Sequence, residues 1–211
     1  MINVLYIHGM GGGGDSRIPS ILRDALADRN INVVVRTYDF DPEAAHRQIS
    51  AWVEELAPAL VIGESLGSVH TLRVRNIPHI LISPSLNAPL YLGYLSWLCL
   101  LPGVTFLFDR IYRPKDGDRQ KLHFTFRTLR KYLKHRREAM RNTTRSGRTD
   151  YYFAFFGTDD HYRKSGIVSL RTWKKHFGDS LMVYEGTHFT EEEHIYSKII
   201  PLICNMLDVN K

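Results

Sequence analysis

The residues Gly63-Glu64-Ser65-Leu66-Gly67 place a serine between two glycines, directly after the apolar run 59–62. A serine on a sharp turn between a strand and a helix lies in strained backbone, and only small residues two positions away avoid clashing with both elements. The following N–H groups lie at a helix N-terminus, where negative charge is favoured. The spacing predicts a nucleophilic Ser65 with the Leu66 amide stabilising an oxyanion; the alternative is a tight turn that merely uses small residues.

A serine needs a general base, and position decides among the ten histidines. His188 follows the apolar run 181–184, which reads as the last strand, so we expect it at the sheet edge where Ser65 also emerges. His194 falls within the pattern of the closing helix, where a solvated or half-buried residue explains it better. His161 is the other candidate, because it borders the acidic pair Asp159-Asp160.

The acid of such a site is expected at the end of the preceding strand, and Asp159 and Asp160 stand there, after the run 151–157. A buried carboxylate bonded to the histidine Nδ1 holds the imidazole in one tautomer and stabilises the imidazolium. Either aspartate would serve, and the other is explained as a turn or cap residue after Gly157. The residues themselves leave the choice between them open.

Alternating apolar runs and amphipathic stretches must position these side chains. Strands are predicted at 2–7, 31–38, 59–63, 79–85, 151–157 and 181–186, and helices from about Ser16 (a capping residue), at 42–56, at 65–75, within 164–177 and from about Thr190. Alternation of this kind implies a parallel sheet with helices on both faces. We therefore expect one α/β domain over 1–211, with three α/β/α layers and a mostly parallel central sheet of about six strands.

The segment 86–149 is far longer than a connection between a strand and a helix needs, so we expect it to form a helical cap. Its part 90–108 is aromatic and aliphatic, which suits an acyl pocket or a lid, or equally core packed on the sheet. The part 126–141 is helical in pattern and strongly basic, which indicates a solvated helix face or an anion-attracting cap.

The order Ser65, Asp160, His188 is the nucleophile, acid and base order of the α/β-hydrolase fold. Over about 1–85 and 150–211 the chain resembles the α/β-hydrolase superfamily serine hydrolases, in particular compact bacterial esterases that begin at the strand carrying His-Gly. The resemblance implies a nucleophile elbow at Ser65, the acid Asp160 rather than Asp159 from a G-x-x-D pattern, and backbone oxyanion donors at Met10 and Leu66. It further implies a small ester or thioester substrate, an acyl-enzyme intermediate, and no metal or organic cofactor.

A glycine loop near the N-terminus offers a different chemistry. Gly9, Gly11 and Gly14 satisfy the G-x-G-x-x-G spacing of a dinucleotide-binding oxidoreductase, and Asp39 stands near where a ribose-binding acid is expected. That loop needs its helix to begin within the glycines, yet consecutive glycines are poor helix formers and the helix pattern starts only at Ser16. This alternative also leaves the serine, aspartate and histidine unexplained.

Positive charge is concentrated in one part of the chain. The formal net charge is +6, but 110–148 holds 14 of the 28 Lys and Arg against three acids, Asp116, Asp118 and Glu138. This segment suits an anionic substrate or a phospholipid surface, and a non-catalytic module of the same fold that binds a partner through it is the rival hypothesis. No base-reading motif accompanies the charge, so nucleic acid is the least favoured partner.

The remaining composition indicates a globular protein of a reducing compartment, with 44% hydrophobic and 24% charged residues. Two distant cysteines, Cys99 and Cys204, suggest neither a disulfide framework nor a zinc site. The stretch 1–9 lacks the basic start of a cleavable signal, and prolines divide the uncharged stretch 77–108 into pieces too short to span a bilayer. We therefore expect a cytoplasmic protein without a transmembrane segment.

Overall fold

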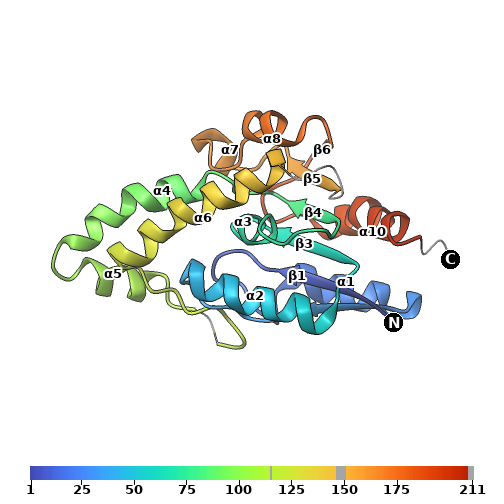
Figure 1. Ribbon diagram of the computed structural model, residues 1–211, viewed down its shortest axis with the longest axis horizontal. Helices are drawn as coiled ribbons and strands as arrows, with labels where there is room; N and C mark the ends of the chain where they lie inside the picture. Colours follow the sequence, from blue (N-terminus) through green and yellow to red (C-terminus); the bar gives the residue numbers. More distant parts are fainter. Residues whose placement is uncertain (115, 146–150, 209–211) are drawn as a thin grey trace.

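One parallel β-sheet organises the protein, whose computed structural model describes residues 1–114, 116–145 and 151–208 (Figure 1). The strands are β1 Ile2–Ile7, β2 Ile31–Val35, β3 Leu60–Glu64, β4 His79–Ile82, β5 Tyr152–Gly157 and β6 Leu181–Tyr184. Within these described ranges the sheet has six strands in the order β2-β1-β3-β4-β5-β6, and every neighbouring pair is parallel. The predicted parallel α/β architecture is confirmed.

The central strands are apolar on both faces because helices cover both faces. Successive side chains of a strand point to opposite sides, so Val4 and Tyr6 of β1 join one buried cluster, while Leu5 and Ile7 join another. All four are almost completely buried. The continuous apolar run of β1 is therefore explained by its place in the middle of the sheet.

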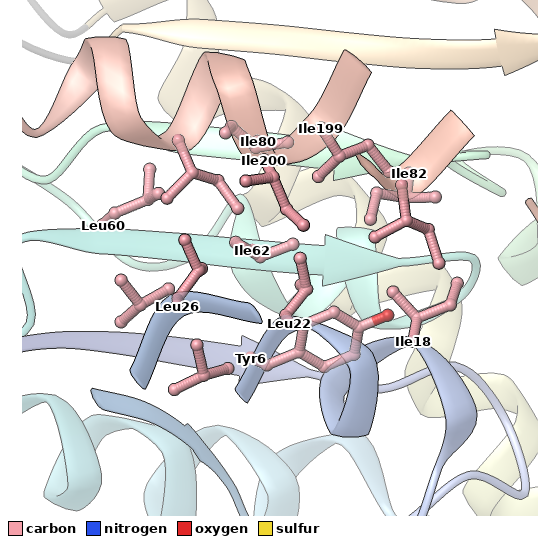
Figure 2. Close-up of a cluster of buried hydrophobic side chains, with 14 of the residues drawn as sticks. Tyr6, Ile18, Leu22, Leu26, Leu60, Ile62, Ile80, Ile82, Ile199 and Ile200 are labelled. Atoms are coloured by element: carbon pink, nitrogen blue, oxygen red, sulfur yellow. The ribbon is translucent and has the colours of Figure 1, made fainter. Parts of the chain in front are cut away.

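The first face of the sheet is covered by α1 (Arg17–Leu26), which η1 (Ala27–Arg29) extends, and by the closing helical segment. That segment consists of α9 (Glu192–His194), the π-helical turn η3 (Ile195–Ile199) and α10 (Ile200–Met206). Figure 2 shows side chains of α1 and of the closing segment meeting those of the strands, among them Leu22, Leu26, Ile199, Ile200, Tyr6 and Ile62.

The second face is covered by α2 (Pro42–Leu56), α3 (Gly67–Thr71) and α8 (Leu170–Phe177), with α6 (Phe126–Arg145) packed against all three. Asp41 starts α2 as its side chain accepts hydrogen bonds from Glu43 N and Ala44 N. Trp173 of α8 is completely buried among the residues of this face. The short helix α7 (Tyr162–Ser165) follows β5 at the edge of the sheet.

The predicted insertion after β4 is mostly helical where it is described. It contains α4 (Ala88–Leu95), η2 (Ser96–Leu100), α5 (Val104–Ile111) and α6, with an irregular segment between α5 and α6, while 146–149 lies outside the described residues. Figure 1 shows α4 running alongside α6, at the end of the molecule away from both chain termini. The alternative that 90–108 packs on the sheet as core is wrong, because α4 and η2 pack mainly on α6, α5 packs on η2, and many apolar side chains of these elements are exposed.

Several predicted element ends differ from the structure. The predicted helix 65–75 is regular only over α3, because Arg73 N and Val74 N bond back three residues instead of four. The predicted strand 79–85 stops at Ile82, since Ser83 adopts a left-handed φ of 46°. Ser16 precedes α1 as predicted, but its Oγ accepts from Gly13 N and does not cap the helix.

Further differences lie in β2, in β6 and in the closing helix; the predicted strand 181–186 ends at Tyr184. The predicted strand 31–38 ends at Val35, after which the chain leaves the sheet. The closing helix begins at Glu192, and it opens into the π-helical turn just before Pro201. Proline lacks an N–H group and its ring displaces the preceding turn, which a wider π-helical turn accommodates.

We expect Leu22→Ala to lower the free energy of unfolding by about 3 kcal/mol, because the substitution leaves a cavity under the sheet. Leu22 is completely buried in the cluster of Figure 2. Urea denaturation followed by circular dichroism measures the change. The neighbouring Ile21→Ala, at a partly buried position, is the control and should cost less; an equal loss in the two variants would contradict the packing described here.

Candidate active site

The turn between β3 and α3 holds Ser65 in a strained conformation. Its φ is 49°, in the left-handed region that residues with a side chain seldom adopt. The Ser65 N–H group donates to the carbonyl oxygen of Ile82 in β4 at 2.9 Å, and the Ser65 carbonyl accepts from Ser85 N at 3.1 Å. The first bond ties the turn to β4 and the second ties it to the loop after β4, so the neighbouring strand and its loop hold the strained conformation.

The two flanking glycines are required by close packing. A Cβ atom on Gly67 would lie 2.3 Å from the carbonyl oxygen of His8, and one on Gly63 would lie 2.3 Å from Thr71 Oγ1. Real Cβ atoms do not approach other atoms so closely, so larger residues would force the turn open. The small residues that the G-x-S-x-G spacing predicted are thus needed at both positions.

Three predicted side chains meet at the carboxyl edge of the sheet. Ser65 Oγ lies 3.0 Å from His188 Nε2, and His188 Nδ1 lies 2.7 Å from Asp160 Oδ2. Ser65 and His188 are 123 residues apart in the chain. They follow β3 and β6, and Asp160 follows β5, so the parallel strands bring their C-terminal ends to one side.

These contacts determine the direction of each hydrogen bond. A carboxylate only accepts, so the proton between His188 and Asp160 sits on Nδ1, and in the neutral imidazole Nε2 is then an acceptor. The hydroxyl of Ser65 therefore donates to Nε2. Ser85 Oγ lies 3.1 Å from Ser65 Oγ, and with the Ser65 proton directed at Nε2, Ser85 is the donor of this pair.

The structure separates the two aspartates that the residues left open. The side chain of Asp160 is fully buried, and its second oxygen, Oδ1, accepts from Tyr162 N at 2.8 Å. Asp159 is exposed, and its carboxylate contacts the adjacent Thr158 hydroxyl at 3.3 Å. Asp160 is therefore the carboxylate that reaches His188.

The competing histidines lie elsewhere. His194 Nε2 is hydrogen-bonded to the carbonyl oxygen of Glu185 at 2.6 Å. His161 is exposed, with its ring centroid 6.0 Å from that of His188. Among the described residues, only His188 forms a hydrogen bond to Ser65 through an imidazole nitrogen.

The glycine loop lies directly against Ser65. A Cβ on Gly9 would lie 3.1 Å from Ser65 Cβ, and Gly12 N donates to the carbonyl oxygen of Gly9 in a tight turn. Gln120, from the insertion, accepts from Gly11 N at 3.0 Å and so holds the loop in place. Because α1 begins only at Arg17, its N-terminus does not meet the glycines as a dinucleotide loop requires.

A cavity of about 290 Å³ opens over Ser65 and His188. Met10 and Leu66 line it, and most of its remaining wall is apolar, formed by Ala88, Tyr91, Leu92, Ile167 and Phe189. A second cavity of about 320 Å³ lies on the other side of Gly9 and Met10 and is more polar, with Arg17 and Arg119 in its wall. Among the described residues, no group of three or more His, Cys, Asp or Glu side chains could hold a metal ion.

Glu64 is a site residue that the sequence pattern did not identify. It precedes Ser65, lines both cavities, and accepts a hydrogen bond from the Tyr6 hydroxyl at 2.7 Å. Burial raises the pKa of the Glu64 carboxyl and of the Tyr6 phenol. A titratable residue at the variable position of the G-x-S-x-G turn was the available signal, together with a tyrosine in the apolar run of β1.

A chain of buried rings leads away from the glycine loop. His8 stacks on Tyr38 with centroids 4.3 Å apart, Tyr38 meets His70 at 5.0 Å, and His70 meets His135 of α6 at 4.6 Å. Burial lowers the pKa of His8 to about 4 and that of His70 to about 3, and it lowers the pKa of His135 as well. These histidines are neutral core residues in the folded protein.

No protein-family model and no curated protein sequence matches the chain. Solved structures do match it over nearly its whole length. A monoacylglycerol lipase from Paleococcus ferrophilus has a TM-score of 0.65 at 17% identity, covering 99% of this chain and 95% of the lipase. Est1E from Butyrivibrio proteoclasticus, with ferulic acid bound, has a TM-score of 0.68 at 15% identity, covering 99% and 90%.

A methylesterase from Arabidopsis has a TM-score of 0.56 at 12% identity and matches over 100% of both chains. At such identities the similarity concerns the backbone. Together with the six-stranded parallel sheet of the described residues, these matches show that the chain has the α/β-hydrolase fold.

We expect the free energy of unfolding to fall as the pH drops below about 6.5, the pKa of histidine in an unfolded chain. His8 and His70 have lower pKa values in the folded state, so the unfolded chain binds protons first. Their stabilisation is complete above pH 6.5 and is lost toward pH 4 and 3. Between pH 7 and 5 each of these two histidines should lower the free energy of unfolding by about 2 kcal/mol, which urea denaturation measures.

A matched pair of variants tests the origin of this pH dependence. His70→Phe removes one buried titrating ring and should reduce the loss between pH 7 and 5, whereas His161→Phe, at an exposed position, should not. An unchanged pH dependence in His70→Phe would show that this ring is not responsible.

Proposed function

We propose that the protein is a serine hydrolase that cleaves a carboxylic ester or thioester through an acyl-enzyme. One observation carries the proposal: a hydroxyl on a strained turn is hydrogen-bonded to an imidazole, which is bonded in turn to a buried carboxylate. The distances are 3.0 Å from Ser65 Oγ to His188 and 2.7 Å from His188 to Asp160. A serine, histidine and aspartate in this relation form an activated nucleophile.

In the acylation step Ser65 Oγ attacks the substrate carbonyl carbon while His188 Nε2 takes the hydroxyl proton. The carbonyl electron pair moves onto oxygen, and the backbone N–H groups of Met10 and Leu66 stabilise that oxyanion. Asp160 stays ionised and stabilises the imidazolium. His188 then gives the proton to the departing alcohol or thiol as the bond to it breaks, which leaves the acyl group on Ser65.

In the second half-reaction a water molecule attacks the acyl-Ser65 carbonyl while His188 takes its proton. The same two backbone amides stabilise the second oxyanion. Collapse of the intermediate returns the proton to Ser65 Oγ and releases the carboxylic acid. All of these steps use groups of this chain, so the proposed reaction requires no metal or organic cofactor.

The cavity supports a small, largely apolar substrate group. Its volume of about 290 Å³ is at the lower limit for pockets that hold small molecules, and its wall is formed mainly by aliphatic and aromatic side chains. Two of the matched structures are described as a monoacylglycerol lipase and a methylesterase, and both names denote ester hydrolysis. We infer that an ester with a short aliphatic or an aromatic group is the substrate class to screen first.

A fluorophosphonate probe, which reacts with activated serines, tests the proposal without a known substrate. We expect covalent labelling of the peptide that contains Ser65, located by mass spectrometry. Labelling should be absent in Ser65→Ala and lost in His188→Ala, while Ser165→Ala, which removes an exposed serine hydroxyl, should label normally. Turnover of p-nitrophenyl esters should fall by about 10⁴-fold or more in Ser65→Ala.

Failure of labelling and of hydrolysis would also be informative. A protein that is folded by circular dichroism, is not labelled and hydrolyses neither esters nor thioesters would contradict the hydrolase proposal. It would favour the non-catalytic binding module of the same fold.

The two adjacent aspartates provide a matched pair for the acid. Asp160→Asn should lower kcat/KM by about 10³-fold or more, because the amide cannot hold the catalytic tautomer of His188. Asp159→Asn should leave kcat/KM nearly unchanged, since its carboxylate is exposed and contacts only its own turn. Equal effects of the two substitutions on ester hydrolysis would contradict the assignment of Asp160.

A further inference from the structure

The elements α4, η2 and α5 carry an unusual number of exposed apolar side chains. We call residues 90–112 the apolar tip. Seven of its side chains are each more than half exposed: Tyr94, Trp97, Leu100, Leu101, Phe106, Leu107 and Ile111. The helix α5 has no buried residue. Exposed apolar surface gathered in this way commonly marks an interaction site. These side chains are not part of the buried core.

A row of cations lies on the neighbouring helix. One face of α6 is buried against α2, α3 and α4 through Leu129, Tyr132 and Ala139. The other face exposes the basic stripe, which consists of Arg127, Arg130, Lys134, Arg137 and Arg141. Their spacing of three or four residues places all five along one side of the helix. The described part of this helix carries one acid, Glu138, which is paired with Arg73 at 2.7 Å and also lies 3.9 Å from Lys134 of the stripe.

The stripe and the tip are in direct contact. The guanidinium of Arg130 lies 5.6 Å from the centre of the Trp97 ring, and Trp97 meets Phe126 at the start of α6 with centroids 5.3 Å apart. Figure 1 shows α4, α5 and the first turns of α6 gathered at one end of the molecule. Two further exposed cations, Arg110 and Arg113, follow within or just after α5. Apolar side chains are thus flanked by positive charge.

We propose that the apolar tip and the basic stripe dock on the surface of a bilayer that contains anionic lipids. Aromatic and aliphatic side chains of the tip would enter the boundary between headgroups and acyl chains, while the cations would lie against lipid phosphates and carboxylates. Tryptophan and tyrosine, both present in the tip, favour this boundary because one end of each ring system is polar. None of the helices in the described residues is long and apolar enough to span a membrane.

The positive charge of the stripe favours an anionic bilayer over a second copy of the chain as the partner of this surface. A second copy of the chain would bring a second basic stripe toward the first or leave both exposed, whereas an anionic bilayer neutralises the whole row. The tip also adjoins the catalytic cavity, since Tyr91 and Leu92 of α4 line it. Docking is independent of the proposed hydrolysis, so it is measured as binding and does not depend on turnover.

Co-sedimentation of the full chain with vesicles tests the proposal. We expect binding to vesicles of equal parts phosphatidylcholine and phosphatidylserine, weak binding to phosphatidylcholine alone, and release by high salt. Arg127→Gln with Arg137→Gln should lower the partition coefficient about 25-fold, at about fivefold per cation. The control removes two exposed cations from the other side of the sheet, Arg23→Gln with Arg29→Gln, and should bind like the unmodified protein.

A second pair of variants tests insertion of apolar side chains. Phe106→Ser with Ile111→Ser should lower the partition coefficient by more than about tenfold. Both side chains are over half exposed in the free protein and would be buried in the bilayer on docking. Met182→Ser with Tyr196→Ser, which changes exposed apolar residues of β6 and the closing helix, is the control and should have no effect.

Tryptophan fluorescence reports the same event at the tip. Of the three tryptophans, Trp97 of the tip is 56% exposed, Trp52 of α2 is partly buried, and Trp173 is fully buried. Anionic vesicles should shift the emission to the blue, and Trp97→Phe should abolish the shift. Absence of vesicle binding by the unmodified protein, or equal effects of tip variants and controls, would overturn the proposal. So would a dimer in solution that Phe106→Ser with Ile111→Ser dissociates, because the tip would then be a contact between copies.

Discussion

The close packing of two glycines at the end of β3 is the constraint on which the rest of the site depends. Gly67 brings the start of α3 against the carbonyl oxygens of Ile7 and His8, and Gly63 brings the end of β3 against Thr71. No side chain fits at either contact. Because both residues are glycines, the chain can turn from strand to helix within a few residues. Ser65 is thereby held at a positive φ, with its hydroxyl at the edge of the sheet.

The parallel sheet converts this local strain into a site. Every strand ends at the same edge, so the loops after β3, β5 and β6 meet there although their residues are far apart in the chain. The loop after β4 adds Ser85, and the loop after β1 adds the glycines. Burial of Asp160, with Tyr162 N bonded to its free oxygen, keeps the carboxylate aimed at His188.

The two faces of helix α6, in the insertion between β4 and β5, have different roles. Its longest helix, α6, buries Leu129 and Tyr132 against the domain and thereby supports α4, which forms one wall of the cavity. The opposite face of α6 is left with the basic stripe, and the apolar tip projects beside it. The same packing that completes the cavity therefore displays an apolar and cationic surface next to it.

The sequence alone determined the parallel α/β architecture and the identities of Ser65 and His188 as candidates, because these rest on local patterns: continuous apolar runs, helical periodicity and a turn that tolerates only small residues. It left the choice between Asp159 and Asp160 open on chemical grounds, since adjacent residues share every local signal and differ only in which way the folded turn points them.

The sequence did not identify Ser85, the Tyr6 and Glu64 pair, or the buried histidines as neighbours of the site. Their roles come from contacts between distant segments, and no local pattern encodes which distant side chain will lie 3 Å away. Tertiary packing also decided that 90–108 covers α6 and not the sheet, because one apolar composition suits either surface.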